Sequence, residues 1–157
     1  MKKVWIGVVV VIIALIAWLV SGYNGLVQMD DQVNGQWSQV ETQLQRRNDL
    51  IPNLVNTVKG YASHEQEAIK AVADARARLG GAKSVKEASE ANDQMTGALS
   101  RLLMVAENYP NLKADANFRA LQDELAGTEN RIAVARRDYN QSVQAFNAKV
   151  RTFPTSV

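Results

Sequence analysis

The stretch VNGQWSQVETQLQRRNDLIPNLVNTVKGY, residues 33–61, decides the fold of this chain. Its apolar residues recur at alternating steps of three and four, which is the spacing of a helix face that packs on other helices. A strand would alternate every second residue, so this period predicts a helix. The frame extends back to Leu26 and places two charged residues, Asp30 and Arg47, within the stripe. The apolar members are Leu26, Val33, Trp37, Val40, Leu44, Ile51, Leu54, Val58 and Tyr61.

Pro52 interrupts this stripe. Proline lacks a backbone N–H and crowds the carbonyl four residues before it. We expect a kink here, with a full break and a new helix from Pro52 as an alternative. Beyond Gly60, the capping-box pattern Ser63-x-x-Gln66 predicts the start of the next helix. A first helix that continues through Gly60 to Leu79 is a further alternative, which would leave three helices.

Two more helices are predicted after the glycine pair at residues 80–81, which ends the second helix. A second capping box, Ser84-x-x-Glu87, begins the third helix. Proline disfavours helix at the residue before it, so the third helix ends near Pro110. The last helix is expected over about residues 113–152. The stripe of the third helix is rich in small residues and consists of Ala88, Ala91, Met95, Ala98, Leu102 and Val105.

A run of seventeen uncharged residues, Val4–Val20, lies near the N-terminus. As a helix it would span roughly 25 Å, near the lower limit for crossing the hydrocarbon core. Trp5 and Trp18 lie near its two ends, where indole rings favour the headgroup region. A cleaved secretory signal is the alternative, but its apolar region is usually about 7–15 residues long. We therefore expect an uncleaved membrane anchor.

The predicted fold class is all-α, with an N-terminal single transmembrane helix followed by an antiparallel up-and-down four-helix bundle. Residues 1–22 would form a cytoplasmic tail and the anchor, and residues 23–157 the bundle. Lys2 and Lys3 precede the anchor, and the first basic residue after it is Arg46. The positive-inside rule therefore places the N-terminus in the cytoplasm. In a bacterium, this predicts an inner-membrane protein whose bundle faces the periplasm or the cell exterior.

The net charge of +2 comes entirely from Lys2 and Lys3. Without them the 18 basic residues become 16, which equals the 16 acidic residues. The sequence pI of about 9.0 therefore reports no basic face. Nucleic-acid binding, which needs Lys and Arg clustered on a surface, has no support.

The sequence carries no motif for catalysis, cofactor binding or metal binding. Cysteine is absent and His64 is the single histidine, which excludes thiolate sites and histidine-pair metal motifs. Phosphate-binding loops and nucleophile elbows are also absent. We expect no enzymatic activity, no catalytic residue, no cofactor and no metal, and we interpret His64 as a surface residue at a helix start.

Arg47 is the least ordinary residue of the first stripe, because a charge at a packing position is costly unless it is paired. We hypothesise that Arg47 meets an acidic residue of another helix, with Glu129 or Glu107 as candidates. The alternative is that its head reaches water from the bundle edge. Trp37 is expected in the core, whereas an exposed Trp37 would indicate a partner surface. The candidate structural or interaction residues are Trp37, Arg47, Pro52, Glu107, Glu129 and Arg136.

Ten short segments of the chain carry a family resemblance, at residues 36–41, 43–47, 49–55, 58–62, 64–65, 106–110, 129–133, 135–137, 139–140 and 153–154. In these segments the sequence resembles the bacterial LemA family. The resemblance covers the anchor and nearly all the rest of the chain. It implies a single-pass membrane protein with an antiparallel helical bundle, and it carries over no catalytic residue. Family members usually continue beyond the Phe153-Pro154 motif into an apolar tail, so the tail is either short here or the sequence is truncated.

The resemblance also suggests partners. The family is similar to magnetosome-associated MamQ proteins, and its members are often discussed beside TPM-domain membrane proteins and membrane metalloproteases. Together with the anchor, this favours a membrane-anchored scaffold or adaptor of the bacterial envelope that forms homo-oligomers and organises membrane-protein partners. The alternative is a membrane-shaping or lipid-surface-binding protein. Helices that bind lipid surfaces are usually rich in Lys and Arg on one face. The equal numbers of basic and acidic residues after the apolar run therefore give this alternative little support.

Overall fold

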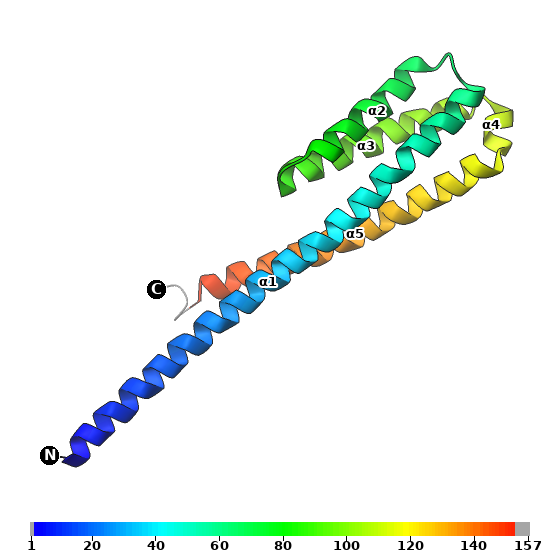
Figure 1. The fold of residues 1–157 in the computed structure, drawn as a ribbon. Helices are drawn as coiled ribbons and strands as arrows, with labels where there is room; N and C mark the ends of the chain where they lie inside the picture. The colour runs from blue at the N-terminus through cyan, green and yellow to red at the C-terminus, as the bar shows by residue number, and fades with distance from the viewer. Residues whose placement is uncertain (1, 153–157) are drawn as a thin grey trace. The chain divides into compact units, whose positions relative to one another are not determined.

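Helices joined by short turns make up residues 2–152, which are the residues that the computed structural model describes (Figure 1). These helices are α1 (Lys2–Tyr61), α2 (Gln66–Gly81), α3 (Val85–Ala106), α4 (Pro110–Ala114) and α5 (Ala116–Val150). No strand occurs within this described part, so the all-helical prediction is confirmed. Phe153 and Pro154, the expected end of the last helix, lie outside the described residues.

The chain divides into two compact units. Unit 1 contains the residues up to Val40 together with those from Ala135 onward, and unit 2 contains Glu41–Val134. The long helices α1 and α5 contribute residues to both units, whereas α2, α3 and α4 belong to unit 2. The predicted boundary between anchor and bundle at residue 22 stays a prediction.

Unit 1 contains the apolar run and a small aromatic contact. Residues 4–20 of α1 are exposed along their whole length, and this part of the helix is long and apolar enough to cross a membrane. Trp5 and Trp18, near its ends, are exposed. Trp37 is half-buried, and its ring packs on that of Tyr139 with centroids 5.3 Å apart and planes tilted by 59°. Trp37 is therefore a packing residue that keeps part of its surface exposed.

An apolar core holds unit 2 together, and every helix contributes to it. Three members of the α1 stripe, Ile51, Leu54 and Val58, face this core because their three-four spacing matches the helical repeat. Burying one large apolar side chain contributes about 1.5–3 kcal/mol. The largest buried apolar residues of this core are Ile51, Leu54 and Val58 of α1, Val72 of α2, Met95 and Leu102 of α3, Leu112 of α4 and Phe118 of α5.

Helix α1 continues through Pro52, so the alternative of a break there is wrong. In a regular helix the N–H of residue 52 would bond to the carbonyl of Asn48, and proline has no such N–H. Arg76 of α2 supplies a replacement, because its Nε donates to the Asn48 carbonyl oxygen at 3.4 Å. A side chain from the next helix thus satisfies the group that proline leaves free.

Two expectations about the region between α1 and α2 are wrong. Helix α1 ends at Tyr61, so a first helix that continues to Leu79 is wrong. Ser63 does not cap α2, whose N-cap position is held by Glu65 without a side-chain cap bond. A backbone bond from the Glu65 N–H to the Ala62 carbonyl, 3.1 Å long, closes the turn and shifts the helix start past Ser63. His64 is exposed, as expected.

The expected last helix, from about Lys113 to about Thr152, is α5, which begins at Ala116. A short helix that was not expected, α4, begins at Pro110, and Asp115 separates it from α5. The Asp115 carboxylate oxygen Oδ1 accepts the N–H of Phe118 at 2.9 Å, which is an N-cap bond. A short polar side chain in this position satisfies a free helix-end donor, so the chain can turn here and begin α5.

The predicted capping box of the third helix is confirmed. The Ser84 hydroxyl accepts the Glu87 N–H at 3.2 Å, and Glu87 Oε2 accepts the N–H of Lys83 at 2.8 Å. The end of α2 at Gly81 is also as predicted.

The two serines of the capping-box patterns should respond differently to alanine substitution. Ser84→Ala removes a cap bond, so we expect the free energy of unfolding to fall by about 0.5–2 kcal/mol. Ser63→Ala removes no cap bond, and we expect a change within about 0.5 kcal/mol. Urea unfolding of the full chain in mild detergent, followed by circular dichroism, measures both. Equal losses for the two variants would contradict the placement of the two helix starts.

Candidate functional site

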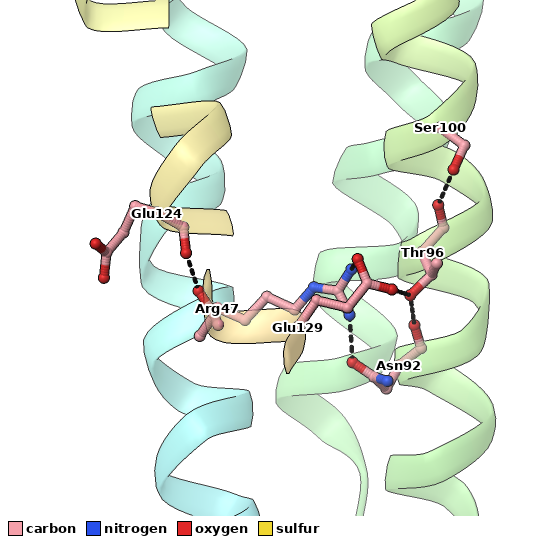
Figure 2. Close-up of polar contacts among 7 residues, drawn as sticks. Arg47, Asn92, Thr96, Ser100, Glu124 and Glu129 are labelled. Carbon is pink, nitrogen blue, oxygen red and sulfur yellow. Dashed lines mark hydrogen bonds and ion pairs between the residues drawn. The ribbon is translucent and has the colours of Figure 1, made fainter. Parts of the chain in front are cut away.

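The candidate site of unit 2 is built around Arg47 of α1. Arg47 follows Leu44 in the apolar stripe, and its side chain is only 1 % exposed. Because Leu44, Arg47 and Ile51 share one face of the helix, the guanidinium of Arg47 lies in the interior together with these apolar side chains. The alternative that the Arg47 head reaches water is wrong. Figure 2 shows the side chain extending from α1 toward polar residues of α3 and α5.

Asn92 of α3 is the closest partner of the guanidinium. Arg47 Nη1 donates to the Asn92 amide oxygen Oδ1 at 2.7 Å, and Asn92 is itself 5 % exposed. A charge-assisted hydrogen bond of this length is among the stronger bonds that a protein makes. The bond joins two buried polar side chains of different helices, and it therefore fixes α1 against α3 at this level.

Glu129 of α5 forms an ion pair with Arg47. Its Oε2 lies 3.8 Å from Arg47 Nη2, and its side chain is 50 % exposed. This separation is too long for a hydrogen bond. Of the two acidic residues suggested for Arg47, the structure thus places Glu129 beside it. Glu107 lies elsewhere in an exposed pair with Lys113, 2.6 Å apart.

The Nε–H of Arg47 is buried and bonds to no group among residues 2–152. Burial lowers the pKa of Arg47 below its ordinary value, while the negative charges of Glu129 and Asp93 oppose that shift. The guanidinium is therefore desolvated and only partly compensated.

Polar residues of α3 continue the network away from Arg47. The Thr96 hydroxyl lies 3.1 Å from the Asn92 carbonyl oxygen and 3.4 Å from Glu129 Oε1. The Ser100 hydroxyl donates to the Thr96 carbonyl at 2.9 Å (Figure 2). Asn92, Thr96 and Ser100 recur every fourth residue, so they form one polar row along α3.

A partly open cavity of about 150 Å³ adjoins this network in unit 2. Leucine side chains from α1, α3 and α5 line it, as do Arg47, Thr96 and Glu129. The cavity thus combines an apolar interior with a buried positive charge.

Further ion pairs lie on the surface around this site. Glu124 of α5 pairs with Arg46 of α1 and with Arg131 on its own helix. These side chains are between 34 % and 56 % exposed, and such pairs contribute about 0–1 kcal/mol each. Of the two, the Arg46–Glu124 pair connects α1 to α5.

A second polar cluster lies where the turns of unit 2 meet. The Tyr109 hydroxyl donates to Glu65 Oε1 at 3.0 Å, and the Tyr61 hydroxyl donates to Asp115 Oδ2 at 2.8 Å. The Phe118 N–H and then the Tyr61 hydroxyl lower the pKa of the Asp115 carboxyl, and the bond to Asp115 raises the pKa of Tyr61. These bonds fasten the turns to one another.

The remaining candidate residues have separate locations. Pro52 lies inside α1, Trp37 contacts Tyr139 in unit 1, and Arg136 is half-buried on α5. Their roles in function stay predictions. No group of three or more His, Cys, Asp or Glu side chains that could hold a metal occurs in the described part of the chain.

Asn92 is the site residue that sequence reasoning missed. The predicted stripe of the third helix uses Ala91 and Ala98 as packing positions, and both are buried. A parallel frame through Asn92, Met95, Leu99 and Leu102 has the same three-four spacing and is equally buried. An asparagine in an apolar frame is the signal that could have found it, and Arg47 in the facing stripe is its counterpart.

Asn92 should stabilise unit 2 more than Glu129 does. Asn92→Leu keeps the branched shape and the number of side-chain heavy atoms but removes the acceptor of Arg47 Nη1, and we expect a loss of about 1–3 kcal/mol in the free energy of unfolding. Glu129→Gln removes a long, half-exposed ion pair and should cost less than about 1 kcal/mol.

Urea unfolding measures the two variants, and Asn56→Leu on the exposed face of α1 is the matched control, expected within about 0.5 kcal/mol of the parent. A larger loss for Glu129→Gln than for Asn92→Leu would refute this order.

Comparisons with known proteins identify relatives of this chain. The family model described as LemA family matches residues 36–157. The chain is 26 % identical over 169 residues to magnetosome protein MamQ 2 of Paramagnetospirillum magneticum, a match that covers 91 % of this chain and 62 % of that protein. It is 25 % identical over 134 residues to protein LemA of Metamycoplasma hominis, covering 85 % of this chain and 61 % of that protein.

The chain therefore spans somewhat less than two thirds of the length of these relatives. The matched segment of the family model includes Arg47, Asn92 and Glu129, so the whole candidate site lies within it. Because the family model covers most of the sequence, this chain belongs to the LemA family.

Proposed function

We propose that this protein is a non-enzymatic, membrane-anchored scaffold or adaptor of the bacterial envelope, which self-associates and holds membrane-protein partners. One observation carries the proposal. The exposed apolar run at residues 4–20 belongs to the same uninterrupted helix, α1, that supplies Ile51, Leu54 and Val58 to the core of unit 2. The membrane segment is thus an extension of a core helix, as expected for a protein whose task is to hold a helical domain at a membrane.

The proposed topology rests on the lysines at the N-terminus. Lys2 and Lys3 precede the apolar run, and the next charged residue along the chain is Asp30. The positive-inside rule then favours a cytoplasmic N-terminus in the inner membrane and an extracytoplasmic helical domain. We further propose that this domain is an antiparallel up-and-down bundle.

The partner classes in this proposal are a second copy of the chain and other membrane proteins. TPM-domain proteins and membrane metalloproteases are the candidates that the family resemblance suggests. The names of the relatives are not those of enzymes, and the proposal assigns no catalytic residue. The charge balance after residue 20 favours protein partners over nucleic acid.

Binding to lipid surfaces or membrane shaping is the second candidate function. Its support is the similarity to magnetosome proteins named MamQ, at 24–26 % identity. Flotation with anionic liposomes, using a version that lacks residues 1–21, separates it from the first candidate. Flotation of that version would favour the lipid-binding role, whereas a version that stays at the bottom of the gradient would favour the scaffold.

Self-association can be tested cleanly because the chain contains no cysteine. We expect single-cysteine variants at exposed positions outside the apolar run, Tyr23→Cys on α1 or Met104→Cys on α3, to give covalent dimers or one consistent partner adduct in native membranes. Val58→Cys is the control, because Val58 is fully buried and does not line the cavity of unit 2, so its thiol should not react.

Electrophoresis after treatment with a membrane-permeant bismaleimide is the measurement. Exposed-position variants that remain monomeric and capture no consistent partner would exclude the scaffold proposal.

A further inference from the structure

We propose that the cavity beside Arg47 is a binding site for a small carboxylic acid with an apolar body. This inference goes beyond the scaffold role and does not depend on it. It starts from the guanidinium, which is buried and has an Nε–H without a partner among the described residues.

Two of the donors of Arg47 that remain for a ligand share one edge of the guanidinium. Asn92 accepts from Nη1, whereas Nε has no partner among residues 2–152 and Nη2 lies 3.8 Å from Glu129 Oε2. Nε and Nη2 form the side edge of the planar group, which can bind both oxygens of a carboxylate through two parallel hydrogen bonds. Because Nε is unpaired, no carboxylate among residues 2–152 bridges this edge.

The cavity that Arg47 lines has the size and lining for an apolar body. Its volume is about 150 Å³, and Leu54, Leu99, Leu103 and Leu125 form the apolar part of its wall together with Ala126. An apolar cavity of about this size can hold a benzene-sized molecule. The site therefore fits a carboxylate attached to a chain or ring of about six apolar carbon atoms.

Glu129 is the intramolecular competitor at this site. It lines the cavity, and its carboxylate is half-exposed and too far from Nη2 for a hydrogen bond. A bound carboxylate would displace it outward into water, which costs little because Glu129 is already half-hydrated. Removing its negative charge should therefore strengthen the binding of an anionic ligand.

The test uses the full chain in mild detergent, with hexanoate as the probe and 1-hexanol as its neutral match. We expect isothermal titration calorimetry to give at least about ten-fold tighter binding of hexanoate, because hydrogen bonds to a charged group exceed neutral ones. Hexanoate should also raise the midpoint of thermal unfolding.

Two variants test the location of the site. Glu129→Gln should bind hexanoate more tightly than the parent. Ala126→Leu places a larger side chain at a residue that lines the cavity, and it should abolish binding while the chain stays folded. Ala133→Leu, at an exposed position on the same helix that does not line the cavity, is the control and should bind as the parent does.

Three results would overturn the proposal. Equal affinity for hexanoate and 1-hexanol would mean that Arg47 does not recognise the carboxylate. Equal binding by Ala126→Leu and Ala133→Leu would place the ligand outside the cavity or in the detergent. Absence of hexanoate binding to both the parent and Glu129→Gln would mean that the cavity takes no such acid.

Discussion

The buried guanidinium of Arg47 is the constraint on which the interior of unit 2 depends. A desolvated charge is expensive, so the polar groups that compensate it must occupy fixed positions. Asn92 of α3 supplies a hydrogen bond and Glu129 of α5 a longer-range charge. One side chain of α1 therefore ties together three helices that their apolar stripes alone would allow to slide past one another.

The backbone carbonyl of Asn48, the residue after Arg47 in α1, also needs a hydrogen-bond donor from another helix. Pro52 leaves the carbonyl of Asn48 without its helical donor, and Arg76 of α2 fills that position. Gly80 gives the Asn48 side chain room, since a Cβ there would lie 3.3 Å from Asn48 Nδ2. The adjacent residues Arg47 and Asn48 thus orient α1 against α3 and α2 through hydrogen bonds. Burial of the apolar side chains around them supplies most of the stability.

The sequence could predict those features whose causes are local. The stripe of α1, the Ser84 cap and the end of α2 each follow from residues within one or two helical turns. The Ser63 prediction is wrong because a backbone turn closed by Ala62 competes with the cap. The start of α5 is missed because Asp115 caps it without a capping-box pattern, since residue 118 is Phe. The pairing of Arg47 with Asn92 joins residues 45 positions apart, and no local pattern specifies which facing residue completes such a contact.

The most direct test of this account is the rate at which the Arg47 Nε–H exchanges with water, measured by NMR on the full chain in detergent. The Nε–H of a buried guanidinium should exchange slowly. Its exchange rate should lie well below that of the Arg137 Nε–H, because the Arg137 side chain is 66 % exposed. The signal is assigned by its loss in Arg47→Lys. Exchange of the Arg47 proton as fast as that of Arg137 would show a solvated head and would contradict the central role given to its burial.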